Sequence, residues 1–496
     1  MAEHFISFDD AVDDLLAAAA YLGERIKSND GHAAAMAVVV PRYLARDNLD
    51  LAAELSNTVD DPFTRDKLLA EVAEKCAEWD DDEYAQQLAD AIEDDGLRSQ
   101  AFEHMAVQKV RKGQIEKAIE IGESMQHPDY VYAAAAAQLA ADDGDKAKDL
   151  LDQVEYPNAR VSAQFAMAAR EFQNGNKESS VAILEEALQT AKDIEHNEER
   201  IRTLCEIGNN YVAVGRNDLA IGAYDAAKQE AEQLNNVHRD AFIGAAVMGF
   251  LHASSMDTAD RTLDLIQDKT QVANCLLAFA TFLWNRDEKD DALEALDESY
   301  QILRSQREME TRDSKTRFAL FGSIAAQYAG FGKGERAIEI ASAIEDQDHR
   351  KSALAQLATV LTLRREDEHA RHAFNEIADD ADRASALVAM SDAKEQIGER
   401  RESITLLDEA SHLVDEIPQL TARSWAYNEI ASRYLDRGQQ GKALEIFDAS
   451  LKTIVGIRDE SNRAVALATL SDLFADGKLE LQEEHRQIVE KLLVTR

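Results

Sequence analysis

The stretch that decides the fold is RIRTLCEIGNNYVAVGRNDLAIGAYDAA, residues 200–227. It contains two apolar segments with helical spacing, and Gly215 stands between them. Glycine ends helices and turns the chain. Each segment also carries a small residue on its apolar face, Gly208 in the first and Ala220 in the second. Small residues at a contact let two helices approach closely. The stretch therefore predicts a helical hairpin with two closely packed helices.

The same pattern recurs along the chain in 13 units. Successive units start about 31–33 or about 39–45 residues apart. Eight residues after the start, 11 of the 13 units carry Ala, Gly or Ser. The starts are Arg65, Arg98, Arg160, Arg200, Arg239, Arg317, Arg350, Arg383, Arg423 and Arg463, with His32, Asp129 and Val272 in the units that lack Arg. Fifteen residues after the start, the expected turn glycines are Gly113, Gly144, Gly175, Gly215, Gly332, Gly398 and Gly438.

With this pattern the chain resembles a tetratricopeptide repeat protein over roughly residues 32–478. The family pattern is a hairpin with a small residue, then Tyr, then Gly at the turn, then Ala and an aromatic residue. Two more units that match it are Tyr427, Ile430, Ala431, Tyr434, Gly438, Ala443, Phe447 and Phe321, Ile324, Ala325, Tyr328, Gly332, Ala337. The resemblance implies an all-α fold, a right-handed α-solenoid of about 13 TPR-like helical hairpins. It says almost nothing about function.

The domain organisation follows from the array. We expect a capping helix in residues 1–31, a first solenoid lobe over 32–316, a second lobe over 317–478 and a second capping helix in 479–496. Terminal repeats need such caps because each hairpin buries its apolar face only against a neighbour. The charged stretch within residues 300–317 either lengthens a helix pair or forms a hinge between the lobes, and the sequence leaves both open.

The arginine at the start of most units stands at a helix N-terminus, where the helix dipole disfavours it. Acidic residues precede it in several units, as with Asp60 and Asp61 before Arg65 and Asp379 and Asp380 before Arg383. Glu93, Asp94 and Asp95 stand in the same way before Arg98. We therefore expect the arginines to bridge these acids and the last carbonyls of the preceding helix. A ligand-binding row is the alternative.

The net charge of the chain argues against nucleic acid as a partner and indicates a high-salt environment. There are 54 Lys and Arg residues against 95 Asp and Glu, so the formal net charge is −41. Nucleic acid is not an expected partner, because phosphate neutralisation needs clustered Lys and Arg. High Asp (49) with low Lys (21) resembles proteins from salt-in halophiles, in which molar KCl screens the repulsion. The alternative is an ordinary acidic mesophilic protein that is stable in low salt.

Several other functions are excluded by absent patterns. The three cysteines, Cys76, Cys205 and Cys275, are too scattered for a disulfide framework or a Cys-rich metal site. No apolar run reaches the ~18 residues of a membrane span, so no membrane association is expected. The first residues lack a basic region followed by an apolar stretch, so a cytoplasmic location is expected.

The first helices of this family line the concave surface of the solenoid. In the middle units the positions expected to point there are small, apolar and almost uncharged. The partner-binding groove is predicted at Phe165, Phe172, Arg202, Asn209, Met248, Leu251, Leu277 and Trp284. These residues form either a groove for a partner helix or extended peptide, or the buried interior of a tight superhelix. Carboxylate recognition is not expected, because Cys205 stands where that variant needs Lys.

No motif in the sequence indicates catalysis. Two Glu-x-x-His pairs, Glu366/His369 and Glu409/His412, match di-iron ligand spacing, but about one such pair is expected by chance. We expect no metal, no cofactor and no enzyme activity. The leading hypothesis is a non-enzymatic protein–protein interaction scaffold or adaptor. The alternatives are a regulatory sensor that changes shape on binding a peptide or small ligand, and a structural repeat protein that assembles with itself as a homo-oligomer.

Overall fold

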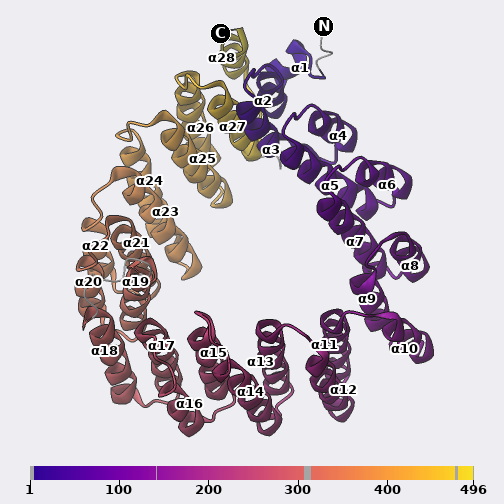
Figure 1. The fold of residues 1–496 in the computed structure, drawn as a ribbon. Helices are drawn as coiled ribbons and strands as arrows, with labels where there is room; N and C mark the ends of the chain where they lie inside the picture. The colour runs from indigo at the N-terminus through magenta and orange to yellow at the C-terminus, as the bar shows by residue number, and fades with distance from the viewer. Residues whose placement is uncertain (1–4, 141, 306–313, 475–478, 495–496) are drawn as a thin grey trace. The chain divides into compact units, whose positions relative to one another are not determined.

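The computed structural model describes residues 5–140, 142–305, 314–474 and 479–494. Over these residues the chain forms 28 α-helices and two short 3₁₀ helices and contains no strand (Figure 1). The predicted all-α solenoid of TPR-like hairpins is confirmed.

Twelve consecutive hairpins follow one another from α3 to α26. Most first helices, including α11 and α13, are 17 residues long. The first helices are α3 (Asn29–Ala45), α5 (Pro62–Glu78), α7 (Asp95–Arg111), α9 (Asp129–Leu139), α11 (Pro157–Gln173), α13 (Asn197–Ala213), α15 (Arg239–His252), α17 (Lys269–Asn285), α19 (Ser314–Gly330), α21 (Gln347–Leu363), α23 (Asp380–Gln396) and α25 (Leu420–Asp436).

The second helices explain the two repeat spacings. Seven are short, between 8 and 10 residues: α4 (Leu49–Asn57), α6 (Asp82–Asp90), α8 (Ile115–Ser124), α10 (Gly144–Gln153), α16 (Met256–Leu263), α20 (Gly334–Ser342) and α22 (Asp367–Asn375). Five are long, between 14 and 17 residues: α12 (Lys177–Thr190), α14 (Asn217–Glu232), α18 (Lys289–Ser305), α24 (Arg400–Val414) and α26 (Gln440–Val455). The units with the longer spacing are those with a long second helix.

Six of the seven expected turn glycines lie in the left-handed region of φ, as at Gly215 (φ 67°), where residues with a side chain are strained. Gly144 was assigned wrongly: α9 ends early, and this glycine begins α10. Other turns use a residue with a side chain at positive φ, as at Asp80 and Asp287. Aspartate tolerates this conformation better than most residues, which is why glycine alone does not mark every turn.

The described chain divides into two compact units. Unit 1 comprises residues 1–105 and 354–496, and unit 2 comprises residues 106–353. The boundaries between the units fall inside α7 and α21. The predicted lobe boundary at residue 316/317 lies within unit 2. The predicted hinge at 300–317 includes residues 306–313, which lie outside the described residues, so the hinge stays a prediction.

Within unit 1 the two ends of the chain pack together. Helix α27 (Glu460–Leu470) packs along α2 (Leu15–Gly23) and α3, and α28 (Glu483–Val494) packs against α1 (Phe8–Asp13), α2 and α26 (Figure 1). Two ion pairs join the ends: Arg42 forms a bidentate pair with Asp472 at 2.8 Å, and Arg486 pairs with Asp13 at 2.8 Å. A thirteenth hairpin is thus completed by α27 and the N-terminal helix α2. The two expected caps lie against each other in the structure.

Tight helix packing in unit 2 depends on a tyrosine between two glycines. Tyr224 on α14 is fully buried, between Gly208 of α13 and Gly249 of α15. A Cβ atom at position 208 would lie 2.6 Å from Tyr224 Cζ, and one at position 249 would lie 2.5 Å from Cδ1. The Tyr224 hydroxyl donates to Asn209 Oδ1 at 2.7 Å. The small residue at the contact position therefore makes room for a ring from the second helix.

Candidate functional site

The arginine column is structural. Six of the arginines that start units donate to the backbone carbonyl six residues earlier, just beyond the end of the preceding second helix, as Arg200 does to Ile194 and Arg423 to Ile417. The other four are Arg98, Arg160, Arg350 and Arg463. For these six of the ten arginines the contacts confirm that the side chain caps a carbonyl left free at a helix end, and they occupy the side chains that a ligand row would need.

The acids that accompany the column are partly different from those expected. Arg98 pairs with Asp95 and Arg383 with Asp380, as predicted. Arg65 instead pairs with Asp66, at 2.9 Å, and with Glu93, and not with the acids that precede it. Asp61 caps the helix: its side chain accepts from the Thr64 N–H, and hydrogen bonds from Thr64 lower the pKa of Asp61.

Sequence reasoning missed a recurring carboxylate that is buried at two positions and half-buried at a third. Asp66 is 1% exposed and accepts from two backbone N–H groups at the start of the next repeat, those of Glu93 and Asp94, at 2.9 and 2.8 Å. Asp129 and Asp240 do the same in their own repeats, accepting at 2.6–2.8 Å. In two of the three cases an arginine precedes the aspartate, so an Arg-Asp pair at a unit start was the available signal. These carboxylates join neighbouring repeats.

The eight predicted groove residues lie on four first helices of unit 2. Phe172 on α11 is 41% exposed, and Arg202 and Asn209 on α13 are also exposed. Phe165, Met248 and Trp284 are half-buried. Leu251 (3% exposed) and Leu277 (9%) are buried. Helix α15 packs against both α13 and α17, and this contact between first helices removes the two leucines from the surface. The side chains of these two leucines therefore expose almost no surface that a partner could contact.

Three of the groove residues already contact other side chains within the unit. The Trp284 ring stacks on Phe331 at the end of α19, with centroids 4.0 Å apart and planes 5° apart. The Asn209 side chain accepts from the Tyr224 hydroxyl. Arg202 lies over the Phe242 ring at 5.5 Å and stays exposed. We name the six residues that keep exposed or half-exposed side chains the first-helix face: Phe165, Phe172, Arg202, Asn209, Met248 and Trp284.

The two Glu-x-x-His pairs form ordinary side-chain contacts, and the buried cysteine thiols are unreactive. Glu366 lies 3.3 Å from His369 in an ordinary one-turn pair, and Glu409 is bound by Arg371 at 2.7 Å. In the described part of the chain, no three His, Cys, Asp or Glu side chains gather as a metal site requires. Burial raises the pKa of the Cys205 and Cys275 thiols to about 12, so neither is a poised nucleophile.

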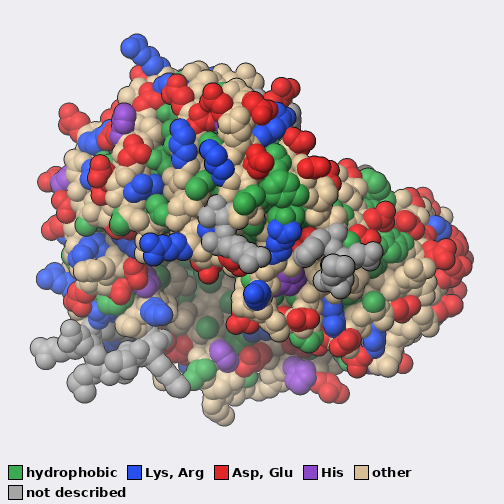
Figure 2. All heavy atoms as spheres, turned by 90° about the horizontal axis from the view of Figure 1, so that it is seen from above, with side chains coloured by type: hydrophobic (Ala, Val, Ile, Leu, Met, Phe, Trp, Pro, Cys, Tyr) green, Lys and Arg blue, Asp and Glu red, His purple; other side chains and the backbone are tan. Residues whose placement is uncertain are grey.

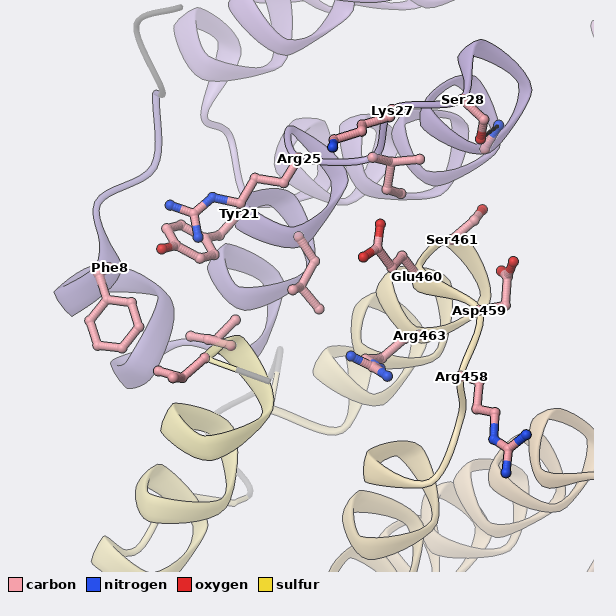
Figure 3. Close-up of a pocket in the computed structure, with 15 residues that line it drawn as sticks. Phe8, Tyr21, Arg25, Lys27, Ser28, Arg458, Asp459, Glu460, Ser461 and Arg463 are labelled. Atoms are coloured by element: carbon pink, nitrogen blue, oxygen red, sulfur yellow. Dashed lines mark hydrogen bonds between the residues drawn. The ribbon is translucent and has the colours of Figure 1, made fainter. Parts of the chain in front are cut away.

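A large hollow in unit 1 lies where the two ends of the chain meet. We name it the terminal cavity. It measures about 1110 Å³ (Figure 3). Its wall comes from α1, α2, the connection to α3, the connection before α27, and the end of α28. The lining residues are Phe8, Tyr21, Leu22, Arg25, Ile26, Lys27, Ser28, Gly31, Arg458, Asp459, Glu460, Ser461, Arg463, Leu493 and Val494.

The charge of this lining is opposite to that of the chain. Four of its residues are basic and two are acidic, although the whole chain carries −41. Acidic side chains are elsewhere spread over the surface, as the face in Figure 2 shows. Figure 3 places Arg25 and Lys27 on the α2–α3 side, with Glu460 and Arg463 at the start of α27. Sequence reasoning missed this cluster because its members come from opposite ends of the chain.

A smaller cavity of about 480 Å³ in unit 1 is lined mainly by α25, α27 and the 3₁₀ helix Ser471–Phe474. Trp425, which is 68% exposed, stands at its edge. The ion pair between Arg42 and Asp472 forms part of its wall. Burial raises the pKa of Glu429 in the same wall, against an opposing effect of Arg433. With two arginines against three acidic residues, this cavity lacks the basic character of the terminal cavity.

No protein-family model matches the chain, and no curated protein matches it. Among solved structures, it is similar to a chain of the Naa15/Naa10 complex bound to HypK-THB, with 14% identity over 94% of this chain and 79% of that one and a TM-score of 0.33. It is also similar to a chain of the APC/C Cut9–Hcn1 hetero-tetramer (15%, 90% and 90%, TM-score 0.22) and to the apo quorum sensor NprR from B. thuringiensis (11%, 70% and 99%, TM-score 0.27). Likeness at this level carries no conclusion about a partner or an activity. Within the described residues, no helix is both long and apolar enough to span a bilayer.

Proposed function

We propose that the protein is a non-enzymatic interaction scaffold that binds a segment of a partner protein on the first-helix face of unit 2. The observation that carries this proposal is the exposed aromatic ring of Phe172 on α11, together with exposed Arg202 on α13, in a strongly acidic chain. Aromatic and arginine side chains supply most of the binding energy at protein interfaces. Half-exposed Phe165 and Met248 extend the same surface with apolar area.

The face is continuous over the helices that follow α13. Helix α15 packs against α13 and α17, and α17 packs against α19, so their outer side chains form one surface. Leu251 and Leu277 support this surface from beneath and do not form part of it. A partner helix or extended segment would therefore contact side chains from several repeats at once, which is how repeat arrays recognise long segments.

A cross-linking experiment tests the proposal. Phe172 is replaced by a photoreactive phenylalanine analogue, the protein is irradiated in cell extract at the source salt concentration, and the cross-linked protein is identified. Binding of that purified protein is then measured to the wild type and to Phe172→Glu/Arg202→Glu. We expect the double variant to bind at least about tenfold more weakly, because it loses an apolar anchor and a charge-assisted contact.

The matched control is Phe63→Glu, which makes the same change at a phenylalanine that is 66% exposed at the start of α5 in unit 1, outside the face. This control should bind the partner as the wild type does. Trp284 is left unchanged, because a charge there would break its stacking on Phe331. Equal affinity of the double variant and the wild type, with helical content unchanged, would refute the groove proposal.

The second candidate is a regulatory sensor whose shape changes when a ligand binds. The terminal cavity favours it, because both ends of the chain line this cavity and a ligand there would contact both. Scattering profiles with and without ligand test this function. Identical dimensions at saturating ligand would exclude a shape change.

The composition also bears on where the protein works and on whether it assembles with itself. We infer a cytoplasmic protein adapted to molar salt, on the basis of its net charge and its low Lys content. Self-assembly as a structural homo-oligomer is the third candidate. Light scattering at the native salt concentration distinguishes it, since a scaffold for another protein gives the mass of a single chain, 55.0 kDa.

A further inference from the structure

The terminal cavity holds cations that have no anionic partner in the described structure. No hydrogen bond or ion pair of the Arg25, Lys27 or Arg458 side chain is present among the described residues. The other charged lining groups are largely engaged: Arg463 donates to the Ile457 carbonyl, and Asp459 caps α27 by accepting from the Asn462 N–H at 2.8 Å. Glu460 is the one carboxylate of the described lining left facing the cavity. Basic side chains therefore outnumber acidic ones in the terminal cavity, although the chain as a whole is acidic.

The Arg25 guanidinium is oriented so that it can bind an anion. Its guanidinium lies over the Tyr21 ring at 3.5 Å, and Tyr21 is buried. A guanidinium stacked on an aromatic ring keeps its N–H groups free in its own plane, where they can form a bidentate pair with a carboxylate or a phosphate. The stacking also fixes the side chain, so less conformational entropy is lost on binding.

Two helices begin at the same place, α3 at Asn29 and α27 at Glu460. Both helix ends are capped: the Ser28 hydroxyl accepts from the Gly31 N–H, and the Asp459 carboxylate accepts from the Asn462 N–H. The side-chain cations, and not the helix ends, therefore define the site.

Part of the wall is apolar and the space is large. Phe8, Leu22 and Ile26 line one side, and Leu493 and Val494 line another; Val494 is 67% exposed. A volume of about 1110 Å³ is at the upper end of the range for small-molecule pockets and far exceeds a bare phosphate. A ligand that fills it must offer both an acidic group and an apolar body.

We propose that the terminal cavity binds a small organic anion, a carboxylate or phosphate ester with an apolar chain or ring, whose acidic group is held by Arg25 and Lys27. Arg458 lies further along the wall and adds to the attraction. The ligand contacts residues from both ends of the chain and therefore stabilises their junction. This inference does not depend on the first-helix face of unit 2.

The test uses hexyl phosphate and hexanoate as probes, with hexyl glucoside as the neutral probe and inorganic phosphate as the anion without an apolar body. Titration calorimetry is run on the full chain at a KCl concentration at which it is folded. We expect one site per chain for at least one organic anion, and much weaker binding of the glucoside and of inorganic phosphate. The stronger of the two organic anions shows whether the acidic group is a phosphate or a carboxylate.

The variant Arg25→Gln/Lys27→Gln removes the two cations and should weaken binding by about tenfold or more. The control Lys148→Gln/Lys192→Gln removes two exposed lysines from unit 2 and should bind as the wild type does. The thermal midpoint should rise with ligand in the wild type and control only. Any one of three results overturns the proposal: no organic anion binds, the glucoside or inorganic phosphate binds as tightly, or the Arg25/Lys27 variant retains full affinity.

Discussion

Gly208 should be the most sensitive small residue in unit 2. Replacing it by alanine places a methyl group against the Tyr224 ring, at a separation well below the 3.5–4.0 Å at which carbon atoms pack without repulsion. The ring has little room to move, because Gly249 of α15 also lies close to its Cδ1 and Cε1 atoms and its hydroxyl is bonded to Asn209. One added methyl must therefore push helix α13 or α14 out of place.

The magnitude follows from two opposing effects. Overpacking a well-packed core costs typically about 1–3 kcal/mol, and we take the upper end because the ring lies close to two helices and its hydroxyl is bonded. Alanine is better than glycine in a helix by about 1 kcal/mol. The net loss in the free energy of unfolding for Gly208→Ala should be roughly 2 kcal/mol. A Cβ atom added to Gly222 on α14 would meet no neighbouring group within 4 Å, so Gly222→Ala should instead stabilise by up to about 1 kcal/mol.

Denaturant unfolding followed by circular dichroism, at one fixed KCl concentration, measures both variants. A second background makes the test specific: in Tyr224→Leu the ring is gone, so the added methyl at position 208 should cost far less there than in the wild type. The reasoning is refuted if Gly208→Ala is as stable as Gly222→Ala, or if its cost is the same in the two backgrounds.

Three other predictions concern the ends of the chain, the thiols and salt. Either Arg42→Asp or Asp472→Arg alone should lower the thermal midpoint, and the double reversal should recover most of the loss. The pair is partly exposed, so the effect should be about 0.5–1 kcal/mol, and no recovery would mean that the ends are not joined there. Because burial raises their pKa to about 12, Cys205 and Cys275 carry almost no thiolate at pH 8 and should react with iodoacetamide at least about 100-fold more slowly than in the unfolded chain; equal rates would contradict their burial. The thermal midpoint should fall when KCl is reduced from about 3 M to about 0.1 M, because the screening length grows to about 10 Å and repulsion within a chain of charge −41 increases; an unchanged midpoint would favour an ordinary acidic protein.

The hairpins were predictable because their signals are local. A small residue, a turn glycine and apolar residues at helical spacing all lie within one unit, and so does the arginine that reaches a carbonyl six residues back, as Arg200 does. The division into short and long units was visible in the spacing. Only the cause, a second helix such as α14 that is several residues longer than α16, required the structure.

The contact face was predicted less well because exposure depends on the neighbouring repeat. Leu251 and Leu277 occupy positions equivalent to those of exposed residues in other units, yet α15 and its neighbours bury them. A repeat period gives the direction of a side chain relative to its own hairpin, and it contains no information on how closely the next first helix approaches. For the same reason the stacking of Trp284 on Phe331 was not foreseen.

The packing of α2 on α27 was indicated by the sequence of α2, which we interpreted instead as a terminal cap. A terminal cap needs one polar face, because one side of it meets solvent. The segment LLAAAAYLG of α2 has none, and eight of its nine residues are buried. A helix that is apolar all round must be covered on all sides. Helices α1, α3 and α28 cover part of α2, and the remaining apolar surface needs another helix. That helix is α27, whose own unit start at Arg463 fits the repeat pattern poorly, as expected for a first helix whose second helix comes from the other end of the chain.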